Sequence, residues 1–320
     1  MTLPADNETP LLSADTTQSP ENTLILGREI ATVTVGGISF QLSFKRRQLR
    51  GTPSGKSSST ENTIVLLHGT GLGLVCFEEL AEALSATVNV ISVDLFGHGY
   101  SDSPELPHDQ YTVARAVRAL LQQQQVQACY VCGHSSGAYV AGAYVILFPG
   151  SCRGLVLLSP SGITLPPPTG CFMAMARSCS CFATVFGRLI ASSMRSGAYK
   201  NMWKGTDDSF DRFKDLVDGD LAVYGRKWVT GLARWVAECR DYGGASGEAF
   251  VATIGGKLAE TGIPALILWG QHDDAAPTCD ATTFKSILGA QLTVLDGHSH
   301  LFVVEAAEEV ARLMVDFWRT

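Results

Sequence analysis

The chain has 320 residues, of which 46% are hydrophobic and 17% are charged, so it can bury one large core, or one core with a smaller subdomain. This composition excludes a wholly disordered protein. The formal net charge is −7, and no basic run is longer than Lys45-Arg46-Arg47, so the sequence offers no extended positive surface to a nucleic acid.

The N-terminal segment, residues 1–24, is rich in Pro, Thr, Ser, Asp and Asn and predicts a flexible tail. It has neither the basic nor the apolar region of a signal peptide, and no later stretch stays apolar for the length of a membrane span. We therefore expect a cytoplasmic protein. Residues 171–194 are apolar apart from two arginines, which favours a buried helix and leaves contact with a membrane surface as the alternative.

Nine cysteines are scattered along the chain, an odd number that does not suit a disulfide framework. Cys129 and Cys132 lie in an apolar run that predicts a strand, and we expect most cysteines to be reduced and buried. Metal binding or redox cycling by this pair is the alternative, but no second Cys/His pair follows at zinc spacing. The sequence therefore predicts neither a metal nor a cofactor.

The order of predicted elements favours the α/β class. Residues 29–44 alternate between apolar and polar around Gly36-Gly37, which predicts a β-hairpin, and residues 51–62 form a polar loop. Beyond them, short apolar runs alternate with stretches of helical period, as in a mostly parallel sheet flanked by helices. The further strands are predicted at residues 64–68, 88–94, 128–134, 154–160, 265–270 and 291–296, and the helices at about 76–85, 111–125, 136–148, 281–288 and 304–318.

A long insertion follows the sixth strand, because about a hundred residues separate Pro160 from Pro264, where a simple crossover needs a dozen or two. Its methionine and aromatic residues predict a helical cap over a cleft at the strand ends, and a subdomain that serves packing alone is the alternative. The predicted organisation is a tail at 1–24, a first core segment at 25–160, a cap at 161–262 and a second core segment at 263–320.

The segment Gly133-His134-Ser135-Ser136-Gly137 fits the pattern G-x-S-x-G. This pentapeptide is short enough to arise by chance, but here it lies where a predicted strand passes directly into a predicted helix, as a nucleophile elbow requires. The glycines suit the turn because side chains at those positions clash with the neighbouring elements. Ser135 is therefore the candidate nucleophile.

The first strong strand ends in His68-Gly69-Thr70-Gly71. Such a segment alone is typical of an ordinary turn. Beside an elbow, however, the backbone N–H groups of Thr70 and Ser136 would converge on a developing oxyanion, and we predict that they form the oxyanion hole.

A serine nucleophile needs a histidine base and a carboxylate that orients it. Asp273 and Asp274 directly follow the strand at 265–270, and Asp273 is favoured. If the chain order is Ser, Asp, His, two candidates for the base remain after the last predicted strand, His298 and His300, and His300 is favoured.

Together these motifs resemble the α/β-hydrolase superfamily, in particular cap-bearing members related to bacterial meta-cleavage hydrolases and epoxide hydrolases. The resemblance covers residues 30–318. The segment 94–102, DLFGHGYSD, is similar to the family's D-x-x-G-x-G-x-S turn, which is structural in relatives. Gly270-x-x-Asp273-x-x-x-Pro277 is similar to the segment with the family's acid, and His300 precedes Glu305 by the family's spacing.

Two features depart from these relatives. They commonly have Gly before the base, whereas here Gly297 precedes His298 and a serine precedes His300, so His298 stays an alternative base. Epoxide hydrolases and dehalogenases carry Asp at the elbow, and the serine here argues against their chemistry, which needs a carboxylate to form an alkyl ester.

The sequence thus predicts a carboxylesterase- or lipase-like serine hydrolase that cleaves an ester, thioester or similar carbonyl substrate through an acyl-enzyme on Ser135. A carbon–carbon bond hydrolase or lyase with the same triad is one alternative, and a small-molecule receptor without significant turnover is another. The apolar insertion predicts a small-molecule partner with an apolar acyl group. The sequence predicts no oligomeric state.

Overall fold

The computed structural model describes residues 27–51, 62–164, 207–239 and 243–319, together with isolated positions (175, 182, 185, 188, 189, 192, 203 and 241). The predicted N-terminal tail and most of the predicted polar loop lie outside these residues. The apolar stretch 171–194 lies outside them apart from the isolated positions.

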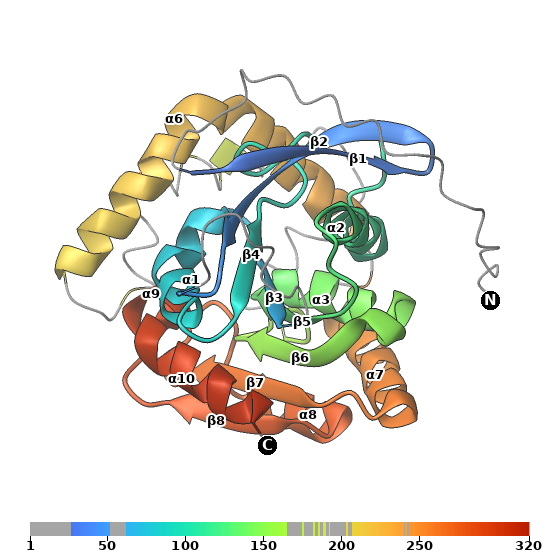
Figure 1. Cartoon of the computed structure of the whole chain (residues 1–320), viewed down its shortest axis with the longest axis vertical. Coiled ribbons are helices and arrows are strands. Elements are labelled where there is room, and N and C mark those ends of the chain that lie inside the picture. Colours follow the sequence, from blue (N-terminus) through green and yellow to red (C-terminus); the bar gives the residue numbers. More distant parts are fainter. Residues whose placement is uncertain are drawn as a thin grey trace.

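In the described part of the chain, eight strands form one sheet in the order β1-β2-β4-β3-β5-β6-β7-β8 (Figure 1). Pairing is antiparallel between β1, β2 and β4 and parallel everywhere else. The predicted α/β class with a mostly parallel sheet is confirmed. The strands are β1 (Glu29–Val35), β2 (Ile38–Arg47), β3 (Thr63–Leu67), β4 (Asn89–Val93), β5 (Cys129–His134), β6 (Cys152–Leu158), β7 (Ala265–Gly270) and β8 (Gln291–Leu295).

The hairpin at one edge of the sheet forms as its sequence predicts. Val35 pairs with Ile38 across a two-residue turn, Gly36-Gly37. Both glycines have positive φ, 57° and 81°, which other residues seldom adopt and which a tight hairpin turn of this kind requires.

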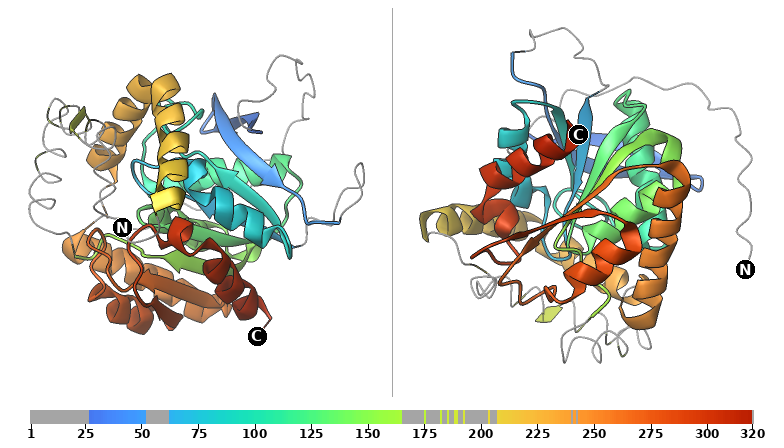
Figure 2. Two further views of the ribbon diagram at one scale, coloured as in Figure 1. Left: turned by 90° about the vertical axis from the view of Figure 1, so that its left-hand side faces the viewer. Right: turned by 90° about the horizontal axis from the view of Figure 1, so that it is seen from below.

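Helices cover both faces of the sheet, as the right-hand view of Figure 2 shows with α10 on one side and α7 on the other. Alternate residues of β3 enter two different cores, Val65 and Leu67 on one face and Ile64 and Leu66 on the other. The helices with described bounds are α1 (Glu78–Leu84), α2 (Gln110–Gln123), α3 (Gly137–Leu147), α6 (Asp207–Glu238), α7 (Gly244–Thr261), α8 (Asp280–Leu288), α9 (Phe302–Glu305) and α10 (Ala307–Trp318), with short 3₁₀ turns at Leu74–Phe77 and Pro149–Ser151.

Within the interval of the predicted cap, residues 207–239 and 243–262 of the described chain contribute helices α6 and α7 after β6. The first half of α6 contributes Phe210 and Phe213 to one core, while Trp235 near its end belongs to the other. The backbones of Gly231 in α6 and Gly97 in the loop after β4 touch so closely that a Cβ on Gly231 would lie 2.5 Å from the Cα of Gly97. The helix is thus seated directly on the loop that follows β4.

One predicted helix is divided. The stretch 304–318 forms α9 and α10, because Ala306 has φ −132° and ψ 36° and interrupts the helical backbone. None of the described helices is long and apolar enough to cross a bilayer.

Candidate active site

The predicted elbow lies between β5 and α3. Ser135 has φ 54°, a strained conformation for a residue with a side chain, and its N–H donates to the Leu158 carbonyl of the neighbouring strand. A Cβ on Gly133 would lie 2.4 Å from the Gly137 carbonyl, and one on Gly137 would lie 2.3 Å from the Leu67 carbonyl. The two glycines therefore let the turn pack against its neighbours while Ser135 keeps its strained position.

Asp273 follows β7 on a tightly bonded loop. Its Oδ1 accepts hydrogen bonds from the N–H groups of Ala275, at 2.9 Å, and Ala276, at 2.7 Å. Trp269 Nε1 donates to the Ala276 carbonyl, which closes the loop back onto the strand. The carboxylate is therefore fixed in both place and direction.

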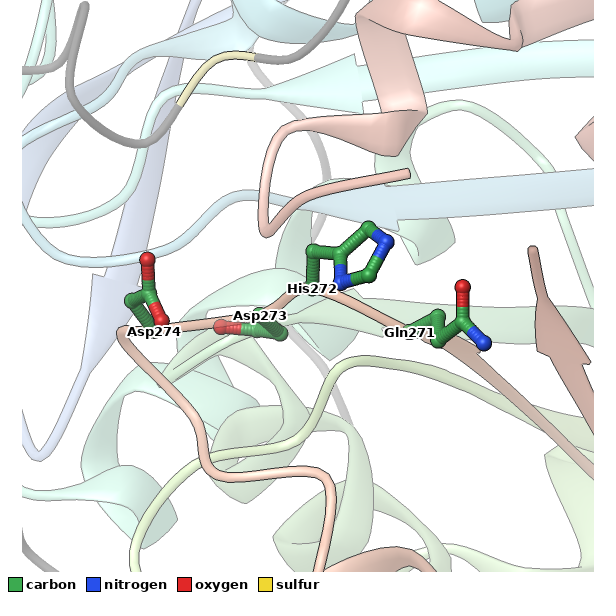
Figure 3. Close-up of a pocket in the computed structure, with 4 residues that line it drawn as sticks. All are labelled: Gln271, His272, Asp273 and Asp274. Atoms are coloured by element: carbon green, nitrogen blue, oxygen red, sulfur yellow. The ribbon is translucent and has the colours of Figure 1, made fainter. Parts of the chain in front are cut away.

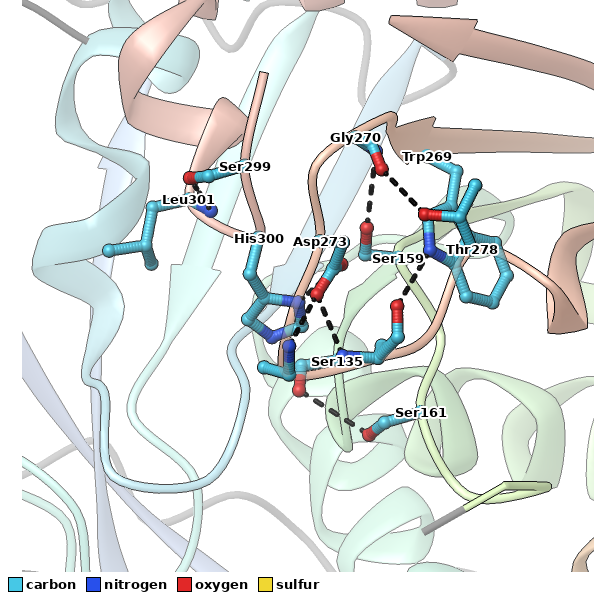
Figure 4. Close-up of polar contacts among 12 residues, drawn as sticks. Ser135, Ser159, Ser161, Trp269, Gly270, Asp273, Thr278, Ser299, His300 and Leu301 are labelled. Atoms are coloured by element: carbon cyan, nitrogen blue, oxygen red, sulfur yellow. Dashed lines mark hydrogen bonds and ion pairs between the residues drawn. The ribbon is translucent and has the colours of Figure 1, made fainter. Parts of the chain in front are cut away.

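The second oxygen of this carboxylate contacts His300. The distance from His300 Nδ1 to Asp273 Oδ2 is 2.7 Å, and both side chains are buried (Figure 4). Burial raises the pKa of Asp273, but the nearby His300 charge and hydrogen bonds from His300, the Ala276 amide and Ser159 outweigh it, so the net shift is downward. Because a carboxylate only accepts, Nδ1 carries the proton and Nε2 of a neutral His300 is left as a base.

The loop with His300 crosses the end of β7. The His272 N–H donates to the His298 carbonyl, and a Cβ on Gly270 would lie 2.1 Å from the Ser299 carbonyl. His134, the residue before Ser135, reaches the same loop, since its Nε2 lies 2.9 Å from the His300 carbonyl. His300 thus lies beside both the loop with Asp273 and the elbow.

The two alternative residues lie elsewhere. His298 Nδ1 is 3.4 Å from Glu305, and its Nε2 is 4.0 Å from Glu309, so this histidine faces the last helices. Asp274 is exposed and does not contact His300 in the described structure, whereas Asp273 does. The structure therefore brings together Asp273 and His300 rather than their neighbours.

Thr70 and Ser136 also meet, but with a contact that the sequence did not predict. The Thr70 N–H donates to Ser136 Oγ at 2.7 Å, and the two hydroxyls are 2.6 Å apart. Gly69 lies against Ser135, because a Cβ at Gly69 would be 2.7 Å from Ser135 Cβ. One of the two predicted oxyanion donors is thus bonded to a side chain in this structure.

Two further serines adjoin the site, and sequence reasoning missed both. Ser159 has φ 41° and hydrogen bonds with Asp273, while Ser161 Oγ lies 3.4 Å from Ser135 Oγ (Figure 4). Both follow β6, which pairs with β5. The sequence did contain an indication of their position. The carboxyl ends of neighbouring parallel strands meet at one edge of the sheet, so polar residues directly after the strand predicted next to the elbow are expected near Ser135.

A cavity of about 490 Å³ opens at the acid loop, where Gln271, His272, Asp273 and Asp274 line it (Figure 3). A second, much smaller cavity of about 10 Å³ adjoins Thr70 and Ser136. Apolar side chains form much of its wall: Leu95, Phe96, Val113 and Trp235. The surroundings of the elbow are thus polar near the acid and apolar behind Thr70.

Among the described residues, no group of three or more His, Cys, Asp or Glu side chains has the arrangement of a metal site. Cys129 and Cys132 enter the cores on opposite faces of the sheet, so they do not share a ligand position. Both are free cysteines, and burial raises the pKa of each thiol well above its usual value.

This fold, with a strained serine between strand and helix and a His–Asp pair beside it, defines a class of α/β enzymes with a nucleophile elbow. A family model described as "Alpha/beta hydrolase family" matches residues 64–313, and the chain belongs to that family.

Individual relatives are distant. The chain is 24% identical to the 2-hydroxymuconate semialdehyde hydrolase of Pseudomonas sp. (strain CF600), over 93% of this chain and 96% of that protein. Among solved structures, it is similar to the enol-lactonase from Burkholderia xenovorans LB400, with a TM-score of 0.67 and 21% identity over 91% of this chain and 100% of that one. It is also similar to a thermophilic esterase from Thermogutta terrifontis, with a TM-score of 0.69 and 18% identity over 91% and 98%.

Proposed function

We propose that the protein is a serine hydrolase that cleaves an ester, thioester or similar carbonyl substrate through an acyl-enzyme on Ser135. The observation that carries this proposal is the 2.7 Å contact between His300 Nδ1 and Asp273 Oδ2, on loops that adjoin the strained serine. A carboxylate in this position stabilises the imidazolium that forms when histidine accepts the serine proton. Membership of the α/β hydrolase family supports the same chemistry.

In the first half-reaction, Ser135 Oγ attacks the carbonyl carbon while His300 Nε2 accepts the hydroxyl proton. The N–H groups of Ser136 and Thr70 stabilise the oxyanion, and for this the Thr70 amide exchanges Ser136 Oγ for the substrate oxygen. His300 then donates its proton to the leaving group. In the second half-reaction, His300 deprotonates a water molecule that attacks the acyl carbon, and the bond to Ser135 Oγ then breaks as His300 returns the proton to that oxygen.

The substrate in this proposal is a small molecule with an apolar group on the carbonyl. The support is the apolar character of the side chains beside Thr70 and Ser136, Leu95, Phe96 and Trp235 among them, and not the cavity between them, which at about 10 Å³ holds about one water molecule at most. Apolar surface at this place favours a hydrocarbon group over a charged one.

Hydrolysis of a carbon–carbon bond is the second candidate. It is favoured by the match to the 2-hydroxymuconate semialdehyde hydrolase, which covers nearly the whole of both chains. The same serine, histidine and aspartate would act on a ketone carbonyl, with a carbanion-type leaving group in place of an alcohol. Assays on ester and on vinylogous diketone substrates side by side would distinguish the two reactions.

The first experiment is labelling with a fluorophosphonate probe, together with turnover of p-nitrophenyl esters of increasing chain length. The variants are Ser135→Ala, Asp273→Asn and His300→Ala. We expect labelling and turnover to vanish with Ser135→Ala and to fall by about 10³-fold or more with the other two.

The chain offers a matched control for each assignment. His298→Ala and Asp274→Asn remove the same groups one or two residues away and are expected to keep labelling and turnover within about threefold of the unmutated protein. Loss of activity in His298→Ala with retention in His300→Ala would contradict the assignment of the base. An unmutated protein that neither labels nor turns over any ester or diketone would contradict the proposed function itself.

A further inference from the structure

A fully buried histidine, His134, stands immediately before the nucleophile at the end of β5. Its Nε2 lies 2.9 Å from the backbone carbonyl oxygen of His300. The two imidazole rings also pack together, with centroids 4.7 Å apart and planes inclined by 44°, while Phe77 contacts the His134 ring edge to face. The side chain therefore joins two segments that are 166 residues apart in the chain.

The direction of this hydrogen bond follows from its acceptor. A carbonyl oxygen only accepts, so His134 Nε2 carries a proton and donates it. Nδ1 is buried and has no hydrogen-bond partner among the described residues, so nothing there favours a second proton. Burial, assisted by the charge of His300, lowers the pKa of His134 to about 3, and the ring stays a neutral donor through the ordinary working range.

The hydrogen bond from His134 to the His300 carbonyl, called the tether below, matters because strand pairing alone does not align Ser135 with its base. Ser135 follows β5, whereas His300 follows β8, and β6 and β7 lie between these two strands in the sheet. The His272 N–H bond to the His298 carbonyl ties the base loop to the acid loop, and Asp273 holds the imidazole. In the described structure, the bond from His134 links the backbone of the base directly to the residue next to the nucleophile.

We propose that His134 is a positioning residue that holds His300 in register with Ser135 through its hydrogen bond to the His300 carbonyl. This inference rests on the proposed function, because it assigns His300 as the base. Catalytic rates are sensitive to such alignment, since a displacement of about 1 Å at the reacting atoms costs on the order of 10²-fold. Losing the tether is therefore expected to lower kcat while leaving substrate binding nearly unchanged.

Two substitutions separate the hydrogen bond from the bulk of the ring. His134→Phe keeps an aromatic ring and removes the donor, and we expect it to lower kcat by about tenfold or more with KM within about twofold. His134→Gln places an amide N–H at a similar reach and is expected to recover most of kcat. If His134→Phe folds poorly by circular dichroism, His134→Asn replaces it, because its amide is too short to reach the carbonyl.

The control is His108→Phe, which removes another buried histidine with a strongly lowered pKa. It lies away from the triad, beside Phe96 and the Pro104 carbonyl. A general loss of packing would affect both histidine-to-phenylalanine variants alike. A positioning role predicts the fall in kcat for His134→Phe only.

A measurement without substrate tests the same point. The proton on His300 Nδ1, bonded to Asp273, is expected to give a far-downfield proton resonance, assigned by its loss in His300→Ala. We expect it to persist in His134→Gln and to broaden or vanish in His134→Phe. An unchanged resonance together with unchanged kcat in His134→Phe would overturn the inference while the proposed hydrolase function stands. If the unmutated protein turns over no substrate, that function fails, and the resonance still decides whether His134 orders His300.

Discussion

At the scale of single residues, the least expected contact is the hydrogen bond from the Thr70 N–H to Ser136 Oγ. In the proposed mechanism the Thr70 N–H donates to the oxyanion, so the Ser136 hydroxyl and the oxyanion compete for the same hydrogen-bond donor. The competition is unequal, because hydrogen bonds to a charged acceptor are roughly twice as strong as those to a neutral one. The hydroxyl nevertheless imposes a cost, since its bond to Thr70 is broken on the way to the transition state.

We therefore predict that Ser136→Ala raises kcat/KM for p-nitrophenyl esters. A neutral hydrogen bond contributes roughly 0.5–1.5 kcal/mol, which corresponds to a gain of about two- to tenfold. Thr70→Val removes only the Thr70 hydroxyl and keeps the amide bonded to Ser136, so it is expected to change kcat/KM less. A marked fall in kcat/KM for Ser136→Ala would mean that the hydroxyl itself stabilises the oxyanion.

At the scale of elements, α6 is held on the loop after β4 by close contact and by hydrogen bonds. Gly231 touches Gly97, and the Arg234 guanidinium donates to the carbonyls of Pro104, at 2.5 Å, and Leu106, at 2.6 Å. The same helix contributes Trp235 to the small cavity beside Thr70. The position of α6 thus helps to shape the surroundings of the elbow.

Gly231→Ala tests this seating. The added Cβ would lie 2.5 Å from the Gly97 Cα, a backbone atom that moves only with its loop, so we predict a loss of about 1–3 kcal/mol in the free energy of unfolding and an increased KM. Gly256→Ala in α7 is the matched control, because nothing lies within 4 Å of its Cβ. Alanine there is expected to stabilise the protein by roughly 0.5–1 kcal/mol through its higher helix propensity. Urea denaturation measures the free energy of unfolding of both variants. A change of the same sign in the two would contradict the inference that the contact with Gly97 requires glycine at position 231.

The sequence predicts helices and strands well where the pattern that defines them lies within the element itself. The strand at 265–270 coincides with β7, and the hairpin follows from alternation around two glycines. The sequence did not predict the break at Ala306, because the apolar residues keep a helical period across it although the backbone leaves the helical conformation there. The boundaries elsewhere differ by a few residues because strand ends depend on pairing partners.

The candidate site is predictable only in part. The G-x-S-x-G pattern between a strand and a helix made Ser135 the candidate nucleophile, and spacing favoured Asp273 and His300. The order Ser, Asp, His left His298 open, since two histidines in one loop satisfy it equally. Only the three-dimensional path of the loop, crossing β7 at Gly270, determines which imidazole meets the carboxylate. The contact between Ser136 Oγ and the Thr70 amide depends on a side-chain rotamer, which no sequence pattern encodes.

At the scale of the whole molecule, several histidines are buried in the neutral form. Burial, the main cause in each case, lowers the pKa from 6.5 to about 4 for His98 and to about 3 for His108 and His134, and it also lowers the pKa of His68. In the unfolded chain these groups return to their ordinary pKa. At a pH between the lowered pKa of the folded state and the ordinary pKa of the unfolded chain, therefore, the unfolded state binds protons that the native state does not.

The sign of the pH dependence follows from this difference. Stability is fully present above about pH 6.5 and falls as the pH decreases toward 4, because each proton bound only by the unfolded chain lowers the unfolding free energy by roughly 1.4 kcal/mol per pH unit. We predict a steep decrease of that free energy over this window in denaturant titrations. His108→Phe removes one of the histidines and should reduce the slope by about one proton, whatever it does to stability at pH 7. Equal slopes in the two proteins would show that His108 binds the same number of protons in the folded and unfolded states, and His108 would then not contribute to the acid sensitivity.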